Sequence, residues 1–515
     1  MTTRAIAGAA GLLLATAPGA WALTAQEVWQ GWQDHYDAMD ARLAAEERTE
    51  NGRLTLTDPV IEMQVGAAGA VSRYEGDIVL SDQDDGSVRV ELPETLRIVV
   101  ETTLPETEDA PAAAPGPMTL AVTHDGLDIV VRDAEVDPDG QVWTMAAATL
   151  TTTIEDVTQG RASEPQPMQM VLSGFESSYR SMPEADGLRA EQSGSAESFT
   201  ISFDVDDMSE LDPEAAPAGT DRTAGAAGFT LDYRATGIEY EGGGVLAPGA
   251  LMDLGKSSDF DVRLSHSGAE LSMNGTSPQG DFSIEGASQG AEATVGIIDG
   301  ALSEAVASDA MDLTVQVPQF PAPLSLSAAR VGVGFDAPVV ATDADTAAPF
   351  GLMLELRDLA VDDMLWGLFD PTGQLPRDPA SILVTLDGTA KLFVDLLTGD
   401  PEAIAALDGP PGEIETLSVT ELLIEAVGAR LIGSGDLTFP TPDPSRPVGA
   451  LDVTLSGGFA LLDRLVALGF LPAQQAGFVK GMAGAVAQSS GEDELTSRIE
   501  FTKDGGITAG GMPLR

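Results

Sequence analysis

Residues 73–92 read RYEGDIVLSDQDDGSVRVEL, and this stretch decides the fold class. It holds a turn signal, Asp84-Asp85-Gly86, and apolar residues at alternating positions on both sides of that turn: Tyr74, Ile78, Leu80, Val88, Val90 and Leu92. A period of two gives a strand one apolar and one polar face, and Asp-Gly pairs favour tight turns. The stretch therefore predicts an antiparallel β-hairpin with one apolar face and one wet face.

The same pattern recurs along the chain. Two further hairpins are predicted about His124-Asp125-Gly126 and about Ser267-Gly268, and alternating runs lie at 199–205, 229–233, 313–317 and 451–455. Successive strands joined by short turns pair antiparallel. We therefore predict a mainly β protein, a β-rich α+β fold of long curved antiparallel sheets. A first β region at 53–211 and a second at 229–515 are separated by 212–228, an Ala-, Gly- and Pro-rich segment predicted to be a flexible linker.

Helices are predicted near the two ends of the chain. An N-terminal amphipathic helix is predicted within 23–52, because Thr24 and Glu27 form a capping box and apolar residues then recur every three or four positions until Asn51-Gly52. Trp29 and Trp32 on this helix require burial, so we expect it to dock onto the main body. Short helices are predicted near 362–369 and, as a pair, at 460–487.

The first 22 residues are typical of a secretory signal peptide. Arg4 supplies a positive charge, 6–17 an apolar stretch, and Ala20-Trp21-Ala22 the small-x-small pattern that precedes cleavage. The most apolar later region, 458–488, is interrupted by charged residues, so no transmembrane segment is expected after cleavage. The sequence therefore predicts an exported, periplasmic protein cleaved after Ala22.

Composition excludes several classes of function. The chain has 515 residues, 82 of them acidic and 26 basic, for a formal net charge of −56. Nucleic-acid binding is excluded because a phosphate backbone would be repelled and the few basic residues are scattered. Cysteine is absent, which excludes disulfides, thiolate metal sites and thiol nucleophiles.

No catalytic, cofactor-binding or metal-binding residue is assigned from the sequence, and no cofactor is expected. The run 250–257 fits a relaxed phosphate-loop pattern, but 260–264 alternates as a strand where a helix is required. The three histidines, His35, His124 and His266, lack a nucleophile elbow or zinc-binding spacing. Acidic clusters at 82–85, 133–139 and 204–207 do not match an EF-hand. Turn chemistry explains their Asp-Gly pairs without a metal, and the sequence does not tell whether these clusters bind calcium.

Three segments resemble a known family. They are 28–34 (VWQGWQD), 366–371 (WGLFDP) with 375–380 (LPRDPA), and 504–514, which begins DGG and ends GMPL. Together they are similar to an uncharacterised family of exported alphaproteobacterial proteins, domain of unknown function 2125. The resemblance implies a periplasmic setting and brings no reaction, cofactor or catalytic residue. Pro376 and Pro379 also predict an extended turn held by an ion pair between Arg377 and Asp378.

Three hypotheses of function follow. The first is a non-enzymatic periplasmic envelope protein that holds a lipid acyl chain or a partner segment in an apolar groove between β-sheets. The second is a periplasmic hydrolase, which requires His124 or His266 within hydrogen-bond reach of a Ser and a carboxylate. The third is a structural partner in an envelope assembly, recognised by an exposed apolar patch or an unprotected strand edge. The sequence favours a protein that is not an enzyme, and it leaves the oligomeric state open.

Overall fold

The computed structural model describes residues 23–38, 41–65, 68–103, 117–134, 140–157, 168–184, 187–205, 228–246, 258–277, 279–341, 346–396, 407, 409–440, 443 and 445–514. The predicted signal peptide, residues 212–227 of the predicted linker and the run 250–257 lie outside these residues.

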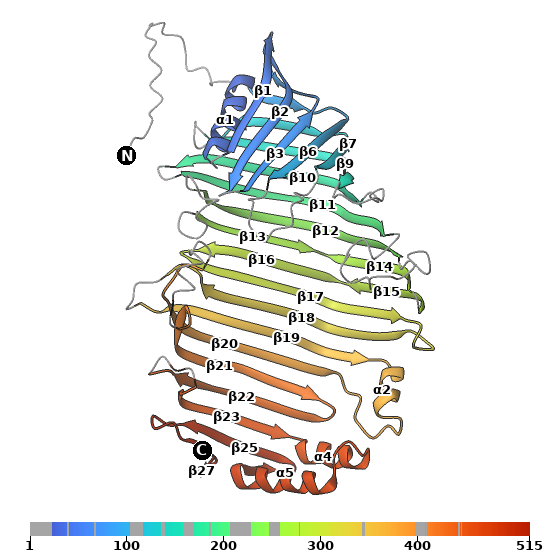
Figure 1. Cartoon of the computed structure of the whole chain (residues 1–515), viewed down its shortest axis with the longest axis vertical. Helices are drawn as coiled ribbons and strands as arrows, with labels where there is room; N and C mark the ends of the chain where they lie inside the picture. Colours follow the sequence, from blue (N-terminus) through green and yellow to red (C-terminus); the bar gives the residue numbers. More distant parts are fainter. Residues whose placement is uncertain are drawn as a thin grey trace.

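The described strands form one antiparallel sheet. From β10 onward its strands cross the long axis one after another toward the C-terminal end, whereas β1, β2 and β3 run steeply to them (Figure 1). The N-terminal strands are β1 Ala41–Glu50, β2 Arg53–Val65, β3 Ala68–Glu75, β4 Asp77–Asp82, β5 Val88–Glu91, β6 Thr95–Thr103, β7 Met118–Asp125, β8 Asp128–Asp133 and β9 Gln141–Val157. The central strands are β10 Met168–Glu184, β11 Gly187–Val205, β12 Gly228–Leu246, β13 Ser258–His266, β14 Gly268–Ser277, β15 Gly280–Ser288, β16 Gly290–Ile298, β17 Ala301–Gln316, β18 Leu324–Pro338 and β19 Ala348–Val361. The C-terminal strands are β20 Ala380–Leu392, β21 Gly412–Ala426, β22 Ala429–Thr438, β23 Val448–Ser456, β24 Gln488–Gly491, β25 Glu494–Phe501, β26 Ile507–Ala509 and β27 Met512–Pro513. The mainly β, antiparallel fold class is confirmed.

Two of the three predicted hairpins are wrong. β4 and β5 pair across 84–86 as expected, with Asp82 opposite Val88. β7 and β8, however, lie end to end along the single strand β9, and β13 and β14 lie end to end along β12. Gly126 and Ser267-Gly268 therefore mark β-bulges within one long strand, because a bulge and a tight turn favour the same small residues.

These bulges belong to a seam that crosses the sheet. Left-handed φ values occur near the middle of successive long strands, at Asp58, Gly76, Gly126, Gly174, Gly237, Ala310 and Asp358. Side chains alternate between the two faces of a strand, and a bulge adds one extra residue to that alternation. The residues that point to the apolar face therefore have even numbers on one side of a bulge and odd numbers on the other. In β17, Leu302 and Val306 precede Ala310, whereas Leu313 and Val315 follow it. The seam therefore keeps one continuous face apolar and bends each strand.

We expect the seam to be testable through Ala310, whose φ of 47° disfavours a side chain. The substitution Ala310→Gly should stabilise the fold by up to about 1 kcal/mol, because it removes the steric cost of a left-handed backbone. The opposite change, Gly174→Ala, should destabilise it, since a Cβ there would lie 2.5 Å from the Glu197 side chain. Thermal unfolding followed by circular dichroism measures both, and a lower melting temperature for Ala310→Gly would contradict the assignment.

Helix α1, Ala25–Ala38, docks onto the N-terminal end of the apolar face. Val28 and Trp29 are fully buried, and the Trp29 Nε1 donates a hydrogen bond to Glu47 Oε1 at 2.7 Å. The expected docking of this helix is therefore confirmed.

The predicted extent of that helix, to residue 52, is wrong, because β1 begins at Ala41 and pairs with β2. Asn51 and Gly52, with φ of 51° and 71°, form the tight turn of this hairpin and not a helix end. Strand pairing thus overrides the helix-favouring composition of 41–50.

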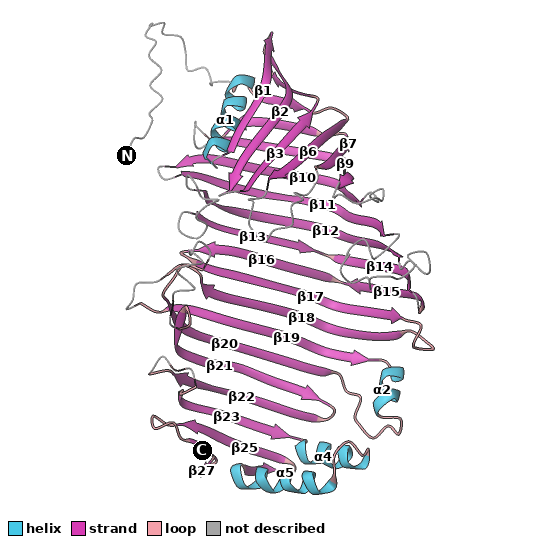
Figure 2. Ribbon diagram, viewed as in Figure 1, coloured by secondary structure: helices cyan, strands magenta, loops and turns pink. Residues whose placement is uncertain are grey.

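The remaining described helices are few and peripheral (Figure 2). Helix α2, Asp363–Phe369, begins at the predicted cap Asp362, whose Oδ1 accepts from the Leu365 N–H at 2.9 Å. Helices α4, Gly458–Ala467, and α5, Ala473–Val486, form the predicted pair at the end of the sheet opposite α1. Among the residues described, no helix has the length and apolar character to cross a bilayer.

Candidate functional site: an apolar trough

In the described part of the chain, the buried hydrophobic cluster lies at the α1 end of the molecule. The buried cluster beneath α1 consists of side chains between Leu23 and Val131, including Leu54, Leu56, Leu80 and Val88. Trp32 lies against Trp143 of β9, with ring centroids 5.2 Å apart. One apolar face of the sheet is thus covered here, whereas no helix comparable to α1 is seen to cover it from β13 to β21 among the described residues.

Beyond the core, the same face carries large apolar side chains that are open to solvent. We name one set of facing residues the apolar row: Leu264, Ala293, Val306, Val333, Leu354, Val384 and Leu422. Four of them are strongly exposed, namely Leu264 at 47%, Val306 at 43%, Val333 at 46% and Leu354 at 41%. Large exposed apolar patches of this kind are typical of interaction sites, which makes the row a candidate site.

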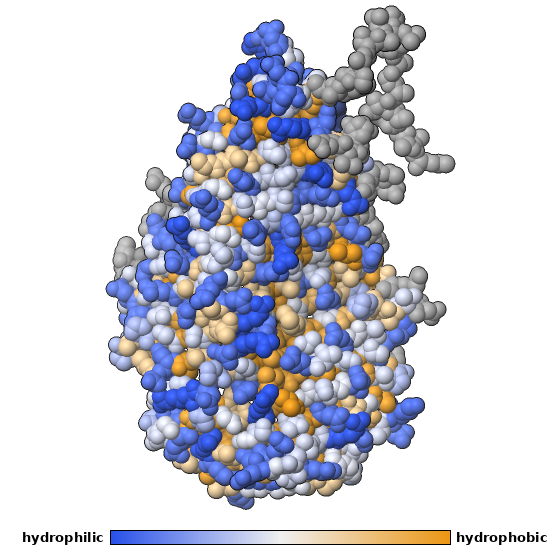
Figure 3. All heavy atoms as spheres, turned by 180° about the vertical axis from the view of Figure 1, so that it is seen from behind, coloured by the Kyte–Doolittle hydropathy of each residue, from blue (hydrophilic) through white to orange (hydrophobic). Residues whose placement is uncertain are grey.

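A second row runs beside the first on that face. It consists of Val262, Val295, Glu304, Phe335, Leu352, Leu386 and Val419. Glu304 is its one charged member and is exposed. The two rows form what we call the apolar trough. It lies on one face of a single sheet, so the predicted position of the groove between β-sheets is wrong. Figure 3 shows apolar residues gathered in a band along the long axis of one face, between hydrophilic margins.

The trough continues into the covered core. Facing positions lead from Leu264 through Tyr240, Gly194, Ser177 and Met145 to the buried cluster. Tyr240 lies across Gly194, where a Cβ would be 2.5 Å from the Tyr240 hydroxyl, and this hydroxyl donates to Ser177 Oγ at 2.7 Å. Helix α1 and this Tyr240 contact therefore close one end of the trough.

The opposite face of the sheet is polar. Cross-strand ion pairs join Arg263 to Glu292 at 2.8 Å and Arg330 to Glu355 at 2.9 Å. Although burial favours the neutral acid, hydrogen bonds from Arg357 and Arg330 hold the pKa of Glu355 below its ordinary value. Such pairs add little stability, but they keep this face wetted and thereby fix which face is apolar.

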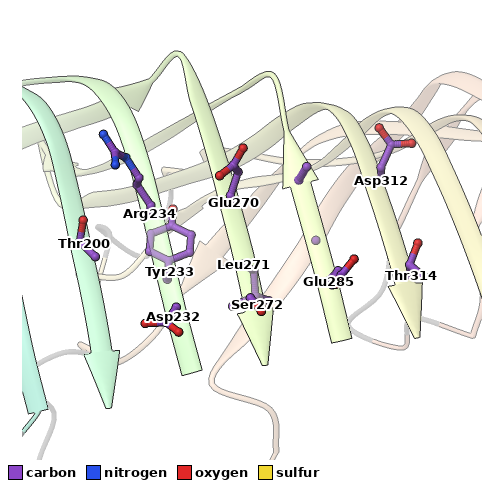
Figure 4. A pocket seen from close by; sticks show the side chains of 12 residues that line it. Thr200, Asp232, Tyr233, Arg234, Glu270, Leu271, Ser272, Glu285, Asp312 and Thr314 are labelled. Atoms are coloured by element: carbon purple, nitrogen blue, oxygen red, sulfur yellow. The ribbon is translucent and has the colours of Figure 1, made fainter. Parts of the chain in front are cut away.

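A depression of about 490 Å³ lies over β11, β12, β14, β15 and β17 (Figure 4). Its charged lining comprises Asp232, Arg234, Glu270, Glu285 and Asp312, all of them exposed. These residues alternate with the apolar positions of their strands, so they belong mainly to the polar face. Within the described ranges, no group of three or more His, Asp or Glu side chains is placed to hold a metal ion.

The histidines do not assemble a catalytic group in the part of the chain that the structure describes. His35 lies edge-on to Tyr36, and burial lowers its pKa. The His124 Nε2 lies 3.1 Å from the carbonyl oxygen of Pro93. Burial lowers the pKa of His266, and its buried Nδ1 has no side-chain hydrogen-bond partner. Among the described residues, neither His124 nor His266 makes the Ser and carboxylate contacts that the hydrolase hypothesis requires.

Two of the described acidic residues in the predicted clusters, Asp82 and Asp85, hold local structure. Asp82 Oδ1 accepts from the Ala25 N–H at 2.7 Å and so joins the start of α1 to β4. Asp85 accepts from the Ser87 hydroxyl at 2.6 Å in the turn before β5, and these hydrogen bonds lower its pKa. Burial and then the charge of Glu27 raise the pKa of Asp133. The members at 137, 139, 206 and 207 lie outside the described residues.

The loop after α2 is fastened by a buried carboxylate. Asp370 is fully buried and accepts from the Gln374 N–H at 3.0 Å and the Leu375 N–H at 2.7 Å. The ion pair predicted between Arg377 and Asp378 is wrong, because Arg377 pairs with Asp363 at the start of α2 and lies 6.0 Å from the Trp366 ring centre. The fold places Asp363, the first residue of α2, beside the guanidinium of Arg377.

Acid should release this loop. Burial opposes the charge of Asp370, yet its hydrogen bonds hold the pKa below the ordinary value of 3.8. A lowered carboxyl pKa gives stability that is complete above the ordinary value and is lost as pH falls through the folded-state pKa. We expect Asp370→Asn to lower the melting temperature at pH 7, and the gap from the wild type to shrink below pH 3.8. A gap independent of pH would show that the charge is not responsible.

The residues of the apolar trough were only partly identified from the sequence. The strand containing Val262 and Leu264 is recognised by its alternation, but Val306 and Leu354 are not singled out. The run Val331-Gly332-Val333-Gly334-Phe335 alternates apolar residues with glycine and could have located the trough.

A protein-family comparison identifies the C-terminal half. The family model described as "Uncharacterized protein conserved in bacteria (DUF2125)" matches residues 258–515, from the first residue of β13 onward. No curated protein and no solved structure matches the chain. Two of the three resemblance segments, at 366–380 and 504–514, lie inside the match, and 28–34 lies outside it. The match covers half of the chain, which therefore belongs to the DUF2125 family.

Proposed function

We propose that this chain is a non-enzymatic periplasmic envelope protein that holds lipid acyl chains in the apolar trough. One observation carries the proposal: the apolar row is contiguous across seven strands, yet its aliphatic side chains remain up to 47% exposed. An apolar ligand would remove this surface from water, with a gain of about 25 cal/mol per Å².

The dimensions of the trough suit acyl chains. Six spacings separate β13 from β21 along the row, and strands lie about 4.8 Å apart, so the row spans roughly 29 Å. A single leaflet of a bilayer has a hydrocarbon depth of about 15 Å, half of the full core. The trough therefore has room for two acyl chains end to end, or for the two chains of one lipid side by side along its two rows.

No observation favours the alternatives as strongly. A hydrolase would need the histidine contacts described above. A structural partner would be recognised by an exposed apolar patch or a free strand edge. The edge strand β1 carries Arg42, Glu46, Glu47, Arg48 and Glu50, charges that discourage pairing with another chain, so such a partner would have to bind the apolar trough itself.

Export and lipid binding are tested together by purification from periplasmic extract. We expect a mature N-terminus at Leu23 and lipid that co-purifies in at least equimolar amount, both measured by mass spectrometry. An intact Met1 in the cytosolic fraction would contradict export, and an empty protein would contradict lipid binding.

A further inference from the structure

Helix α5 presents an outward face without a single charge, in a chain of net charge −56. Its only charged residue, Lys480, turns inward and donates to Asp463 Oδ1 of α4 at 2.7 Å. The face consists of Gln474, Gln475, Gly477, Phe478, Val479, Gly481, Met482, Gly484 and Ala485, all exposed. Phe478 is 70% exposed, Val479 45% and Met482 46%.

This arrangement contrasts with the other long helix. The exposed side of α1 carries Glu27, Asp34 and Asp37, as the surface of an acidic protein requires. On α5, only Ala476 is buried. The connection to α4 adds Phe470, which is 58% exposed. A helix whose outer side is apolar and uncharged normally has that side in contact with an apolar environment and not with water.

The local charge also differs from that of the rest of the chain. Residues 458–487 hold Asp463, Arg464 and Lys480, a net charge of +1. A negatively charged lipid surface therefore repels this segment less than it repels the acidic chain as a whole.

We propose that the α4–α5 hairpin docks on a lipid bilayer, with Phe470, Phe478, Val479 and Met482 entering the interface between headgroups and acyl chains. The hairpin lies at the opposite end of the sheet from α1 (Figure 1), so the trough extends away from the membrane. The inference goes beyond the proposed function, because α5 needs no ligand in the trough to bind a vesicle.

A protein partner fits this surface less well. The four side chains expose apolar area on the order of 400 Å². A stable protein–protein interface buries about 800 Å² on each partner. The glycines Gly477, Gly481 and Gly484 have open space around them and offer no side chain for specific recognition. A lipid interface requires no specific recognition, and its binding strength increases with the buried apolar area without a minimum set by a partner surface.

Flotation of the full mature protein with phosphatidylcholine vesicles, in 0.15 M salt, tests the proposal. We expect the wild type to float and Phe478→Ser/Met482→Ser to lose at least tenfold in the bound fraction. Leu368→Ser/Ile298→Ser is the matched control, because those two side chains are 60% and 53% exposed elsewhere. The control should float as the wild type does.

A second measurement reports on the helix itself. The variant Phe478→Trp should show a blue-shifted emission of its added indole when vesicles are present, relative to the wild type. A wild type that does not float, or equal loss in both double variants, would overturn the proposal. So would a dimer in light scattering that Phe478→Ser/Met482→Ser abolishes, which would assign the face to a second copy. Lipid in the trough is measured separately, so either proposal can fail without the other.

Discussion

The double substitution Leu264→Asp/Val333→Asp should empty the apolar trough without unfolding the protein. Both side chains belong to the apolar row, on β13 and β18, and are 47% and 46% exposed. A bound acyl chain would remove water from the carboxylate beside it, and this desolvation costs several kcal/mol. The charge therefore disfavours binding of the chain. Each 1.4 kcal/mol is a factor of ten in affinity, so bound lipid should fall more than tenfold.

The matched control places the same charges on the other face. Asn274→Asp/Thr294→Asp alters strands β14 and β16 at positions that alternate with the apolar ones. We expect this variant to retain wild-type lipid when both proteins are analysed by mass spectrometry after periplasmic purification. Equal lipid in the two variants, with unchanged melting temperatures, would place the ligand elsewhere or show that there is none.

Trp29→Ala should be the most destabilising single substitution in α1. Trp29 is fully buried between α1 and the sheet, and its indole N–H is satisfied by Glu47. Loss of a buried Trp costs about 3–5 kcal/mol, through lost burial and the cavity that remains. The Glu47 carboxylate that loses this donor is exposed and still accepts from Gln26 Nε2, so its contribution to the loss is small.

Chemical denaturation with a two-state fit measures this effect. The control Asp37→Ala, on the exposed side of the same helix, should stay within about 0.5 kcal/mol of the wild type. If Trp29→Ala left the free energy of unfolding unchanged, α1 would not be part of the cooperative core.

The sequence predicts the fold class, the docked helix and the C-terminal pair because each depends on a local period. Prediction from the sequence fails where the same short sequence is compatible with two local structures. Asn51-Gly52 ends a helix or turns a hairpin, and Ser267-Gly268 turns a hairpin or forms a bulge. Only the pairing of β1 with β2, and of β13 and β14 with β12, decides between them.

The sequence predicts that the sheet has an apolar face, but it does not predict which part of that face is left uncovered. Alternation at Val262 and Leu264 indicates one apolar face, but it cannot show that α1 covers only one end of that face. The partner of Arg377 was likewise inaccessible, because Asp363 lies 14 positions away and is brought near by the fold.

From β9 to β23, nearly every strand pairs only with strands close to it in sequence. Such a molecule is quasi-one-dimensional, so gain or loss of two consecutive strands would preserve the direction of every remaining one. Each such event would change the length of the container by about 9.6 Å, two strand spacings. The length of the sheet could thus change in evolution by two strands at a time, while the helices at its two ends stay the same.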